Sequence, residues 1–181
     1  MFKKFKPTWM VEAIYQIQPE QLKKLGFKAV LADLDNTLIA WNNPDGTEEL
    51  IQWIKWMKQA DIPVIILSNN SDKRIKRVAD SLNLRYIPRA LKPTTLGFKE
   101  AIKKLKLDKN EIVMVGDQVI TDVFGANRAG IKSVLVRPII DSDAWNTKIN
   151  RYFELRIMRL LKKHDPEMKW RSGIHDENII E

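Results

Sequence analysis

The chain has 181 residues, 44% of them hydrophobic, so it can bury the core of one domain with modest appendages. It contains no cysteine, which excludes disulfides, a thiol nucleophile and thiolate metal sites. The only histidines are His164 and His175, both near the C-terminal end, which argues against a histidine-based triad or a histidine-rich metal site and favours oxygen ligands for any metal. The net charge of +8 favours an anionic partner, such as a phosphorylated substrate, nucleic acid or acidic lipid.

Residues 1–26 mix basic and apolar side chains, and we expect them to form two short helices that pack on the core. Pro19, which follows Gln18, is typical of a helix start. No secretory signal follows the basic start, and no apolar run approaches membrane-spanning length, so we expect a cytoplasmic protein. The basic ends leave peripheral association with the inner face of an anionic membrane as an alternative.

Strands alternate with helices of about ten residues through residues 27–140, which we interpret as the core domain. We expect strands at 27–33, 62–67, 84–87, 111–115 and 131–136. Such βαβ units imply a parallel sheet covered on both faces, a Rossmann-like three-layer α/β/α sandwich. The remaining segment, 141–181, should contain one helix over 145–163 and a loose polar end from Asp165.

Polar side chains follow the ends of four of these strands. Asp33 and Asp35 end the first, Ser68 and Asn69 follow the second, Lys92 follows the third, and Asp117 ends the fourth, with Asp122 about one turn later. Taken alone, each of these features has an ordinary structural explanation: a turn, a solvated lysine or a helix cap. It is hard to explain by chance that all four features occur in order and each at a strand-to-helix junction. Because ligands bind beyond the carboxyl ends of parallel strands, we expect one shared site.

This set of side chains suits phosphoryl transfer. Carboxylates hold Mg²⁺, which offsets the repulsion between a carboxylate nucleophile and an anionic phosphate. A lysine adds positive charge, and a hydroxyl with backbone N–H groups binds phosphate oxygens. The nucleophile can then be an aspartate, which would give an aspartyl-phosphate that water later hydrolyses.

The motifs resemble those of the haloacid dehalogenase (HAD) superfamily over residues 27–136. They read Asp33-Leu34-Asp35-Asn36-Thr37-Leu38, Ser68-Asn69-Asn70, Lys92-Pro93 and Gly116-Asp117-Gln118-Val119-Ile120-Thr121-Asp122. The residues of these motifs resemble those of the small YqeG-type phosphatases of subclass IIIA, and that resemblance extends along most of the chain. Related proteins include phosphatidylglycerophosphate phosphatases.

The resemblance implies how catalysis would be divided among these residues. Asp33 would be the nucleophile, and Asp35 the general acid/base that protonates the leaving alcohol and later activates water. Ser68, helped by the amide of Asn69, would hold the transferring phosphoryl group. Lys92 would stabilise Asp33 and the charge of the phosphate.

The resemblance also implies a Mg²⁺ site and its supports. Asp33, the main-chain carbonyl of Asp35 and the carboxylate of Asp117 would hold the ion. Asp122 would contact a metal-bound water or orient the motif lysine. Thr37 would support the loop after the first strand.

The spacing of the motifs leaves no room for a cap domain. Residues 38–67 hold one loop, one helix and one strand, and the interval between Ser68 and Lys92 holds one helix and a short strand. An open site suits a large substrate, or one presented by a membrane, such as phosphatidylglycerophosphate. For the helix over 145–163, packing on the domain or a homodimer contact is favoured over lipid binding.

Two other functions stay open at this point. A regulatory protein that keeps the HAD scaffold and binds RNA or the ribosome would agree with the charge of +8. However, no RNA-binding motif with stacked aromatics is visible and the lysines are dispersed, so nucleic acid is not the expected partner. Intact Asp33, Asp35, Lys92 and Asp117 count against an inactive enzyme. The third interpretation is a phosphotransferase that passes phosphate to an alcohol.

Overall fold

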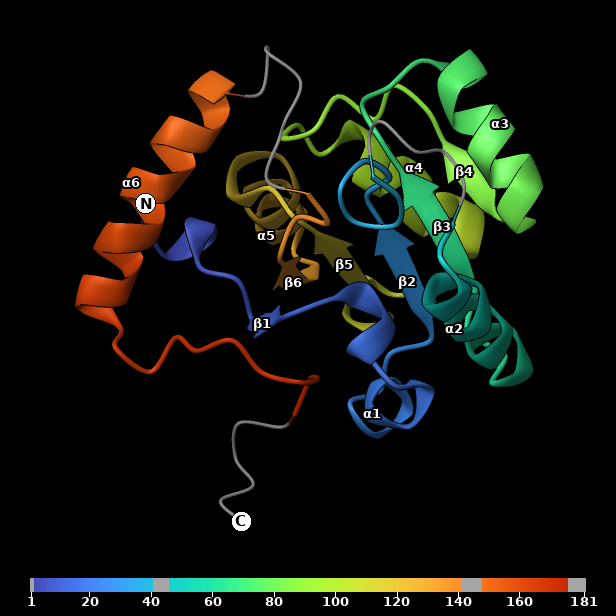
Figure 1. The fold of residues 1–181 in the computed structure, drawn as a ribbon, viewed down its shortest axis with the longest axis horizontal. Coiled ribbons are helices and arrows are strands. Elements are labelled where there is room, and N and C mark those ends of the chain that lie inside the picture. Colours follow the sequence, from blue (N-terminus) through green and yellow to red (C-terminus); the bar gives the residue numbers. More distant parts are fainter. Residues whose placement is uncertain (1, 41–45, 141–147, 176–181) are drawn as a thin grey trace.

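Figure 1 shows the computed structural model, which describes residues 2–40, 46–140 and 148–175. Six strands form one sheet in the order β1-β6-β5-β2-β3-β4, and every neighbouring pair is parallel. The strands are β1 (Trp9–Val11), β2 (Ala29–Ala32), β3 (Val64–Leu67), β4 (Arg85–Ile87), β5 (Ile112–Gly116) and β6 (Lys132–Val136). The five strands predicted in the core correspond to β2–β6, so the parallel sheet is confirmed.

Helices cover both faces of this sheet (Figure 1). They are α1 (Pro19–Lys24), α2 (Glu48–Gln59), α3 (Asp72–Leu82), α4 (Leu96–Leu105), α5 (Phe124–Ala129) and α6 (Lys148–His164), with short turns η1 (Phe2–Phe5), η2 (Ile14–Gln16), η3 (Lys109–Glu111) and the π-helical η4 (Val119–Val123). In β2, Val30 and Ala32 pack with α2 and α3, whereas Ala29 and Leu31 pack with α4 and α5. This alternation confirms the predicted three-layer sandwich.

The carboxyl edge of the sheet is open in the part of the chain that the structure describes. Between β2 and β3 that part contains a loop and α2, and between β3 and α4 it contains α3 and β4, so no cap domain is present there. From β2 the chain continues to β3 and β4 on one side, while β5 and β6 lie on the other. The topological switch point, where α/β sheets bind ligands, therefore falls between β2 and β5.

The expectation of two short helices in residues 1–26 is wrong for residues 9–11. These residues form the edge strand β1, which pairs with β6 in the register Trp9↔Val134 and Val11↔Val136. All three side chains of β1 are buried. Three residues that are buried on both faces show no period, so the local pattern does not distinguish this strand from a helical turn.

The expectation of a loose end from Asp165 is also wrong for the residues described, 165–175. The Arg171 N–H donates to the carbonyl of Met10 at 2.9 Å, which continues hydrogen bonding along the edge of β1. Ile174 is buried, and the Trp9 indole N–H donates to the carbonyl of His175 at 2.7 Å. The polar composition gives no sign of this contact, because main-chain groups and the single buried side chain of Ile174 hold the segment.

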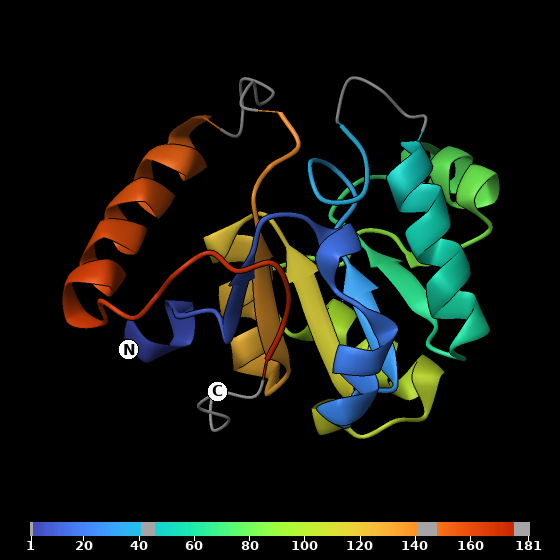
Figure 2. The ribbon, with the colours of Figure 1, turned by 60° about the horizontal axis from the view of Figure 1, so that its bottom comes forward.

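Helix α6 lies beside the N-terminal segment rather than over the sheet (Figure 2). Of the predicted helix, 145–147 lie outside the described residues. Ile157 and Met158 pack against Met10 and Val123, which bears out the expectation that this helix packs on the domain. None of the described helices has the length and apolar character needed to cross a bilayer.

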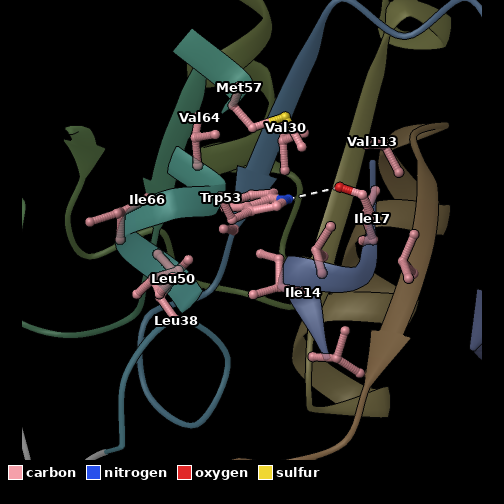
Figure 3. Close-up of a cluster of buried hydrophobic side chains, with 14 of the residues drawn as sticks. Ile14, Ile17, Val30, Leu38, Leu50, Trp53, Met57, Val64, Ile66 and Val113 are labelled. Carbon is pink, nitrogen blue, oxygen red and sulfur yellow. Dashed lines mark hydrogen bonds between the residues drawn. The ribbon is translucent and has the colours of Figure 1, made fainter. Parts of the chain in front are cut away.

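Trp53 of α2 ties the N-terminal segment to the core (Figure 3). Its ring is fully buried beside Leu50 and Met57, and its indole N–H donates to the carbonyl of Ile17 at 2.7 Å. Trp56, three residues later on the same helix, is 41% exposed. The two tryptophans therefore form a natural matched pair for measuring what this buried contact contributes.

We expect Trp53→Phe to lower the free energy of unfolding by about 1–3 kcal/mol, because the buried Ile17 carbonyl loses its donor and the smaller ring leaves a gap. The Trp56→Phe control should change stability by no more than about 0.5 kcal/mol. Urea unfolding followed by circular dichroism measures both. Equal losses in the two variants would show that the Trp53 contact has no special role.

Candidate active site

A buried lysine joins three of the predicted motifs. The Nζ of Lys92 lies 2.7 Å from Oδ1 of Asp33 and 2.7 Å from Oδ1 of Asp122. Its side chain is 2% exposed. Asp33 directly follows β2, Lys92 precedes α4, and Asp122 lies in η4 after β5. The sheet thus brings together three side chains from distant parts of the chain, as the sequence analysis expected.

Asp117 completes a cluster of three carboxylates. Oxygens of Asp33, Asp117 and Asp122 all lie within 4.8 Å of one another, and all three side chains are buried. Thr37, in the loop after β2, donates from Oγ1 to Oδ1 of Asp117 at 3.3 Å. Buried carboxylates in excess of the single lysine need further positive charge, and oxygen ligands suit Mg²⁺. The residues present therefore fit such an ion.

The charges of this cluster influence one another strongly. Burial raises the pKa of Asp33 to about 8; Lys92 opposes the rise, and Asp122 and Asp117 add to it. Burial alone would lower the pKa of Lys92, but Asp122 and Asp33 outweigh burial and raise it above its ordinary value. Lys92 therefore stays charged at neutral pH, while Asp33 needs additional positive charge to be fully ionised. A divalent cation would supply that charge.

Asp122 is held in place from two sides. Its Oδ1 accepts from Lys92, and its Oδ2 accepts from the main-chain N–H of Gln118 at 3.1 Å. A Cβ at Gly116 would lie 2.3 Å from Cγ of Asp122, so only glycine leaves space for this carboxylate. Of the two roles expected for Asp122, the contact agrees with orienting Lys92.

The loop after β3 supports the same lysine. Asn69 Oδ1 accepts from the main-chain N–H of Lys92 at 2.7 Å, and its Nδ2 donates to the Lys92 carbonyl at 2.8 Å. The side-chain amide of Asn69 is thus engaged in fixing the main chain of Lys92. Ser68 is buried at the end of β3, and its Oγ accepts from the Asn70 N–H at 3.2 Å.

Asp35 lies outside the buried carboxylate cluster. Its Oδ2 accepts from Asn70 Nδ2 at 2.5 Å, and its Oδ1 accepts from Arg74 Nη2 at 2.7 Å. Sequence reasoning did not single out Arg74 or the steric role of Gly116. In the sequence, an arginine in the first turn of an amphipathic helix is indistinguishable from any solvated residue. Gly116, in contrast, is part of the Gly116–Asp122 motif.

The Rossmann-like fold and the cluster around Lys92 define the class of protein as a phosphoryl-transfer hydrolase. The sequence model of the haloacid dehalogenase-like hydrolase family matches residues 2–130, and the chain belongs to this family. It is 42% identical over 164 residues to the Bacillus subtilis protein named "Probable phosphatase YqeG", covering 90% of this chain and 95% of that protein. These findings confirm the resemblance and identify the chain as a HAD-type phosphatase.

Three further proteins match this chain at lower sequence identity. The chain is 29% identical over 145 residues to phosphatidylglycerophosphate phosphatase 1 of Arabidopsis thaliana, covering 74% of this chain and 41% of that longer protein. A protein of uncharacterised function from Listeria monocytogenes superposes with a TM-score of 0.53 at 21% identity, covering 74% of this chain and 99% of that chain. The deoxy-D-mannose-octulosonate 8-phosphate phosphatase of Haemophilus influenzae superposes with a TM-score of 0.51 at 16% identity, covering 77% and 90%. Both structures share the fold.

We expect Gly116→Ala to lower kcat/KM for an aryl phosphate by about 100-fold, because the new methyl group displaces Asp122 and with it Lys92. Gly46→Ala is the matched control. A Cβ at Gly46 would lie 3.1 Å from Cδ2 of Leu82, 3.3 Å from Cδ2 of Leu50 and 3.9 Å from Cγ1 of Ile51, none of which belongs to the carboxylate cluster. Steady-state kinetics with circular dichroism as a folding check would test this. Wild-type kinetics in Gly116→Ala would contradict the packing argument.

Proposed function

We propose that this phosphatase hydrolyses a phosphomonoester in a Mg²⁺-dependent reaction through an aspartyl-phosphate on Asp33. The observation that carries the proposal is the buried Lys92 ammonium, which contacts Asp33 and Asp122 at 2.7 Å each beside the carboxylate of Asp117. Such a cluster places a carboxylate nucleophile next to a fixed positive charge. An anionic phosphoryl group requires both.

In the first step, a carboxylate oxygen of Asp33 attacks phosphorus while the bond to the ester oxygen breaks. Lys92, oriented by Asp122, binds the charge that Asp33 and the phosphoryl group share. The Ser68 hydroxyl and the main-chain N–H of Asn69 hold the phosphoryl oxygens. Asp33, the Asp35 main-chain carbonyl and Asp117 would hold Mg²⁺, which would supply positive charge that offsets the repulsion between nucleophile and phosphate.

Asp35 acts as the general acid and then as the general base. It gives a proton to the leaving oxygen, and it later takes a proton from the water that attacks the aspartyl-phosphate. That attack releases inorganic phosphate and restores Asp33. A phosphotransferase would use an alcohol in place of this water, so release of inorganic phosphate separates the two interpretations.

Asp33→Asn is expected to lower turnover of an aryl phosphate on the order of 10⁴-fold or more, because an amide cannot form the phospho-enzyme. Removing divalent ions with EDTA should abolish activity, and added Mg²⁺ should restore it. Asp61→Asn is the control, since this exposed aspartate lies in the turn after α2. Release of inorganic phosphate measures all of these. Robust turnover by Asp33→Asn would defeat the mechanism.

We further propose that the substrate is presented by an anionic membrane, with phosphatidylglycerophosphate as the leading candidate. Three apolar side chains at the carboxyl edge, Leu91, Leu96 and Ile139, are between 44% and 59% exposed. Leu91 directly precedes Lys92, and the Ile139 N–H donates to the carbonyl of Asn36 at 3.0 Å, so apolar groups lie on two sides of the site. The net charge of +8 and the named substrate of the Arabidopsis relative support the same proposal.

Replacing the three rim residues together, as Leu91→Asn, Leu96→Ser and Ile139→Ser, is expected to reduce binding to phosphatidylglycerol vesicles about tenfold or more. The reason is lost apolar contact with the bilayer; Asn suits the positive φ of residue 91, which is 54°. The ratio of lipid to aryl phosphate turnover should fall in parallel. Vesicle co-sedimentation and phosphate release measure these effects.

A matched control carries Leu155→Ser and Leu160→Ser, two exposed leucines of α6, the helix that lies beside the N-terminal segment. This variant should bind vesicles like the wild type. If instead the α6 variant loses binding and the rim variant keeps it, the protein docks through α6. If the wild type itself ignores anionic vesicles, the proposal of a membrane-presented substrate is wrong.

A further inference from the structure

We propose that Arg74 determines substrate class: it holds Asp35 in the free enzyme and binds a second anionic group on the substrate, which releases Asp35 for catalysis. The preferred substrates would be phosphomonoesters that carry a second negative charge. The inference rests on the proposed function in one respect, because it takes Asp35 as the general acid/base.

The first support is the pair of contacts on Asp35. Arg74 Nη2 donates to its Oδ1 at 2.7 Å, and Asn70 Nδ2 donates to its Oδ2 at 2.5 Å. Both carboxylate oxygens thus have a side-chain donor at hydrogen-bond distance, and a leaving oxygen has to compete with these donors for the carboxyl group. Exchange of the Arg74 contact would open one of the two oxygens to the leaving group.

The second support is the exposure of this ion pair. The side chain of Arg74 is 43% exposed and that of Asp35 is 24% exposed, whereas that of Lys92 is 2% exposed. Exposed ion pairs contribute little to stability, so a ligand can replace one partner at small cost. The buried pair of Lys92 with Asp33 cannot be exchanged in this way without leaving an unpaired charge.

The third support is proximity to the expected phosphoryl position. Asn70 joins the two places: its main-chain N–H donates to Ser68 Oγ at 3.2 Å, and its side chain donates to Asp35. Arg74 lies in the first turn of α3, directly after this loop. A substrate whose phosphoryl group is held at Ser68 thus brings the rest of its structure near Arg74.

The chemistry of the guanidinium group indicates what that part of the substrate should be. Its planar set of donors matches phosphate and carboxylate groups with two parallel hydrogen bonds. A substrate with a second anionic group competes with Asp35 for Arg74, and Asp35 is then available to the leaving oxygen. A substrate without such a group leaves the Arg74–Asp35 pair intact, so its kcat should be low even when it binds. The phosphodiester of a phospholipid head group meets the requirement.

The test uses two water-soluble probes, which removes any dependence on membrane binding. Glycerol 3-phosphate carries only the phosphomonoester, and glycerophosphoglycerol phosphate carries a phosphomonoester and a phosphodiester. The wild type should favour the second probe by about tenfold or more in kcat. Arg74→Gln should bring this ratio close to one. Arg74→Lys should keep part of it, because a lysine supplies charge without the paired donors.

Arg77→Gln is the matched control, since Arg77 is also exposed on α3, three residues further on. It should keep the wild-type ratio. If Arg74→Gln keeps the preference, or loses activity equally on both probes, Arg74 does not select substrates. Equal turnover of both probes by the wild type would also overturn the inference while leaving the phosphatase mechanism intact. If the wild type turns over neither probe and also lacks Mg²⁺-dependent activity on an aryl phosphate, the proposed function itself is wrong.

Discussion

The buried ammonium of Lys92 is the constraint on which the rest of the site depends. A lysine this deeply buried is tolerated only with charged partners at hydrogen-bond distance, and Asp33 and Asp122 provide them. These partners follow the neighbouring strands β2 and β5, whose pairing is extended by the Asp33 N–H donating to the carbonyl of Val115 at 2.9 Å. The pairing of β2 with β5 therefore also brings together the residues that contact Lys92.

The side chains that surround Lys92 explain several features of the sequence that have no chemistry of their own. Gly116 is needed because Asp122 occupies the space of a side chain, and Asn69 is needed because its amide fixes the main chain of Lys92. Thr37 holds Asp117 in a similar way. The motifs thus contain the residues proposed to act on the phosphate together with the residues that position them.

Those parts of the fold and site that side-chain patterns encode could be predicted from the sequence. The apolar runs of β2, β3 and β5 and the polar side chains at their ends identified the parallel sheet and the edge at which the site lies, because a fully buried parallel strand has few alternatives. Strand β1 and residues 165–175 could not be predicted, since main-chain pairing at a sheet edge leaves little trace in a sequence. The contact of Arg74 with Asp35 was hidden for another reason: it is tertiary, and an arginine on α3 looks solvated.

The buried and the exposed ion pairs of the site differ in a way that suits an enzyme whose described residues include no cap. Lys92 and Asp33 are buried, so their geometry is the same for every substrate and serves the phosphoryl group that all substrates share. Arg74 and Asp35 are partly exposed, so their geometry can respond to the leaving group, in which substrates differ. Because the described residues include no lid, we propose that selectivity comes from such side chains at the rim. The exposed apolar neighbours Leu91 and Ile139 add the surface on which the proposal of a membrane-presented substrate rests.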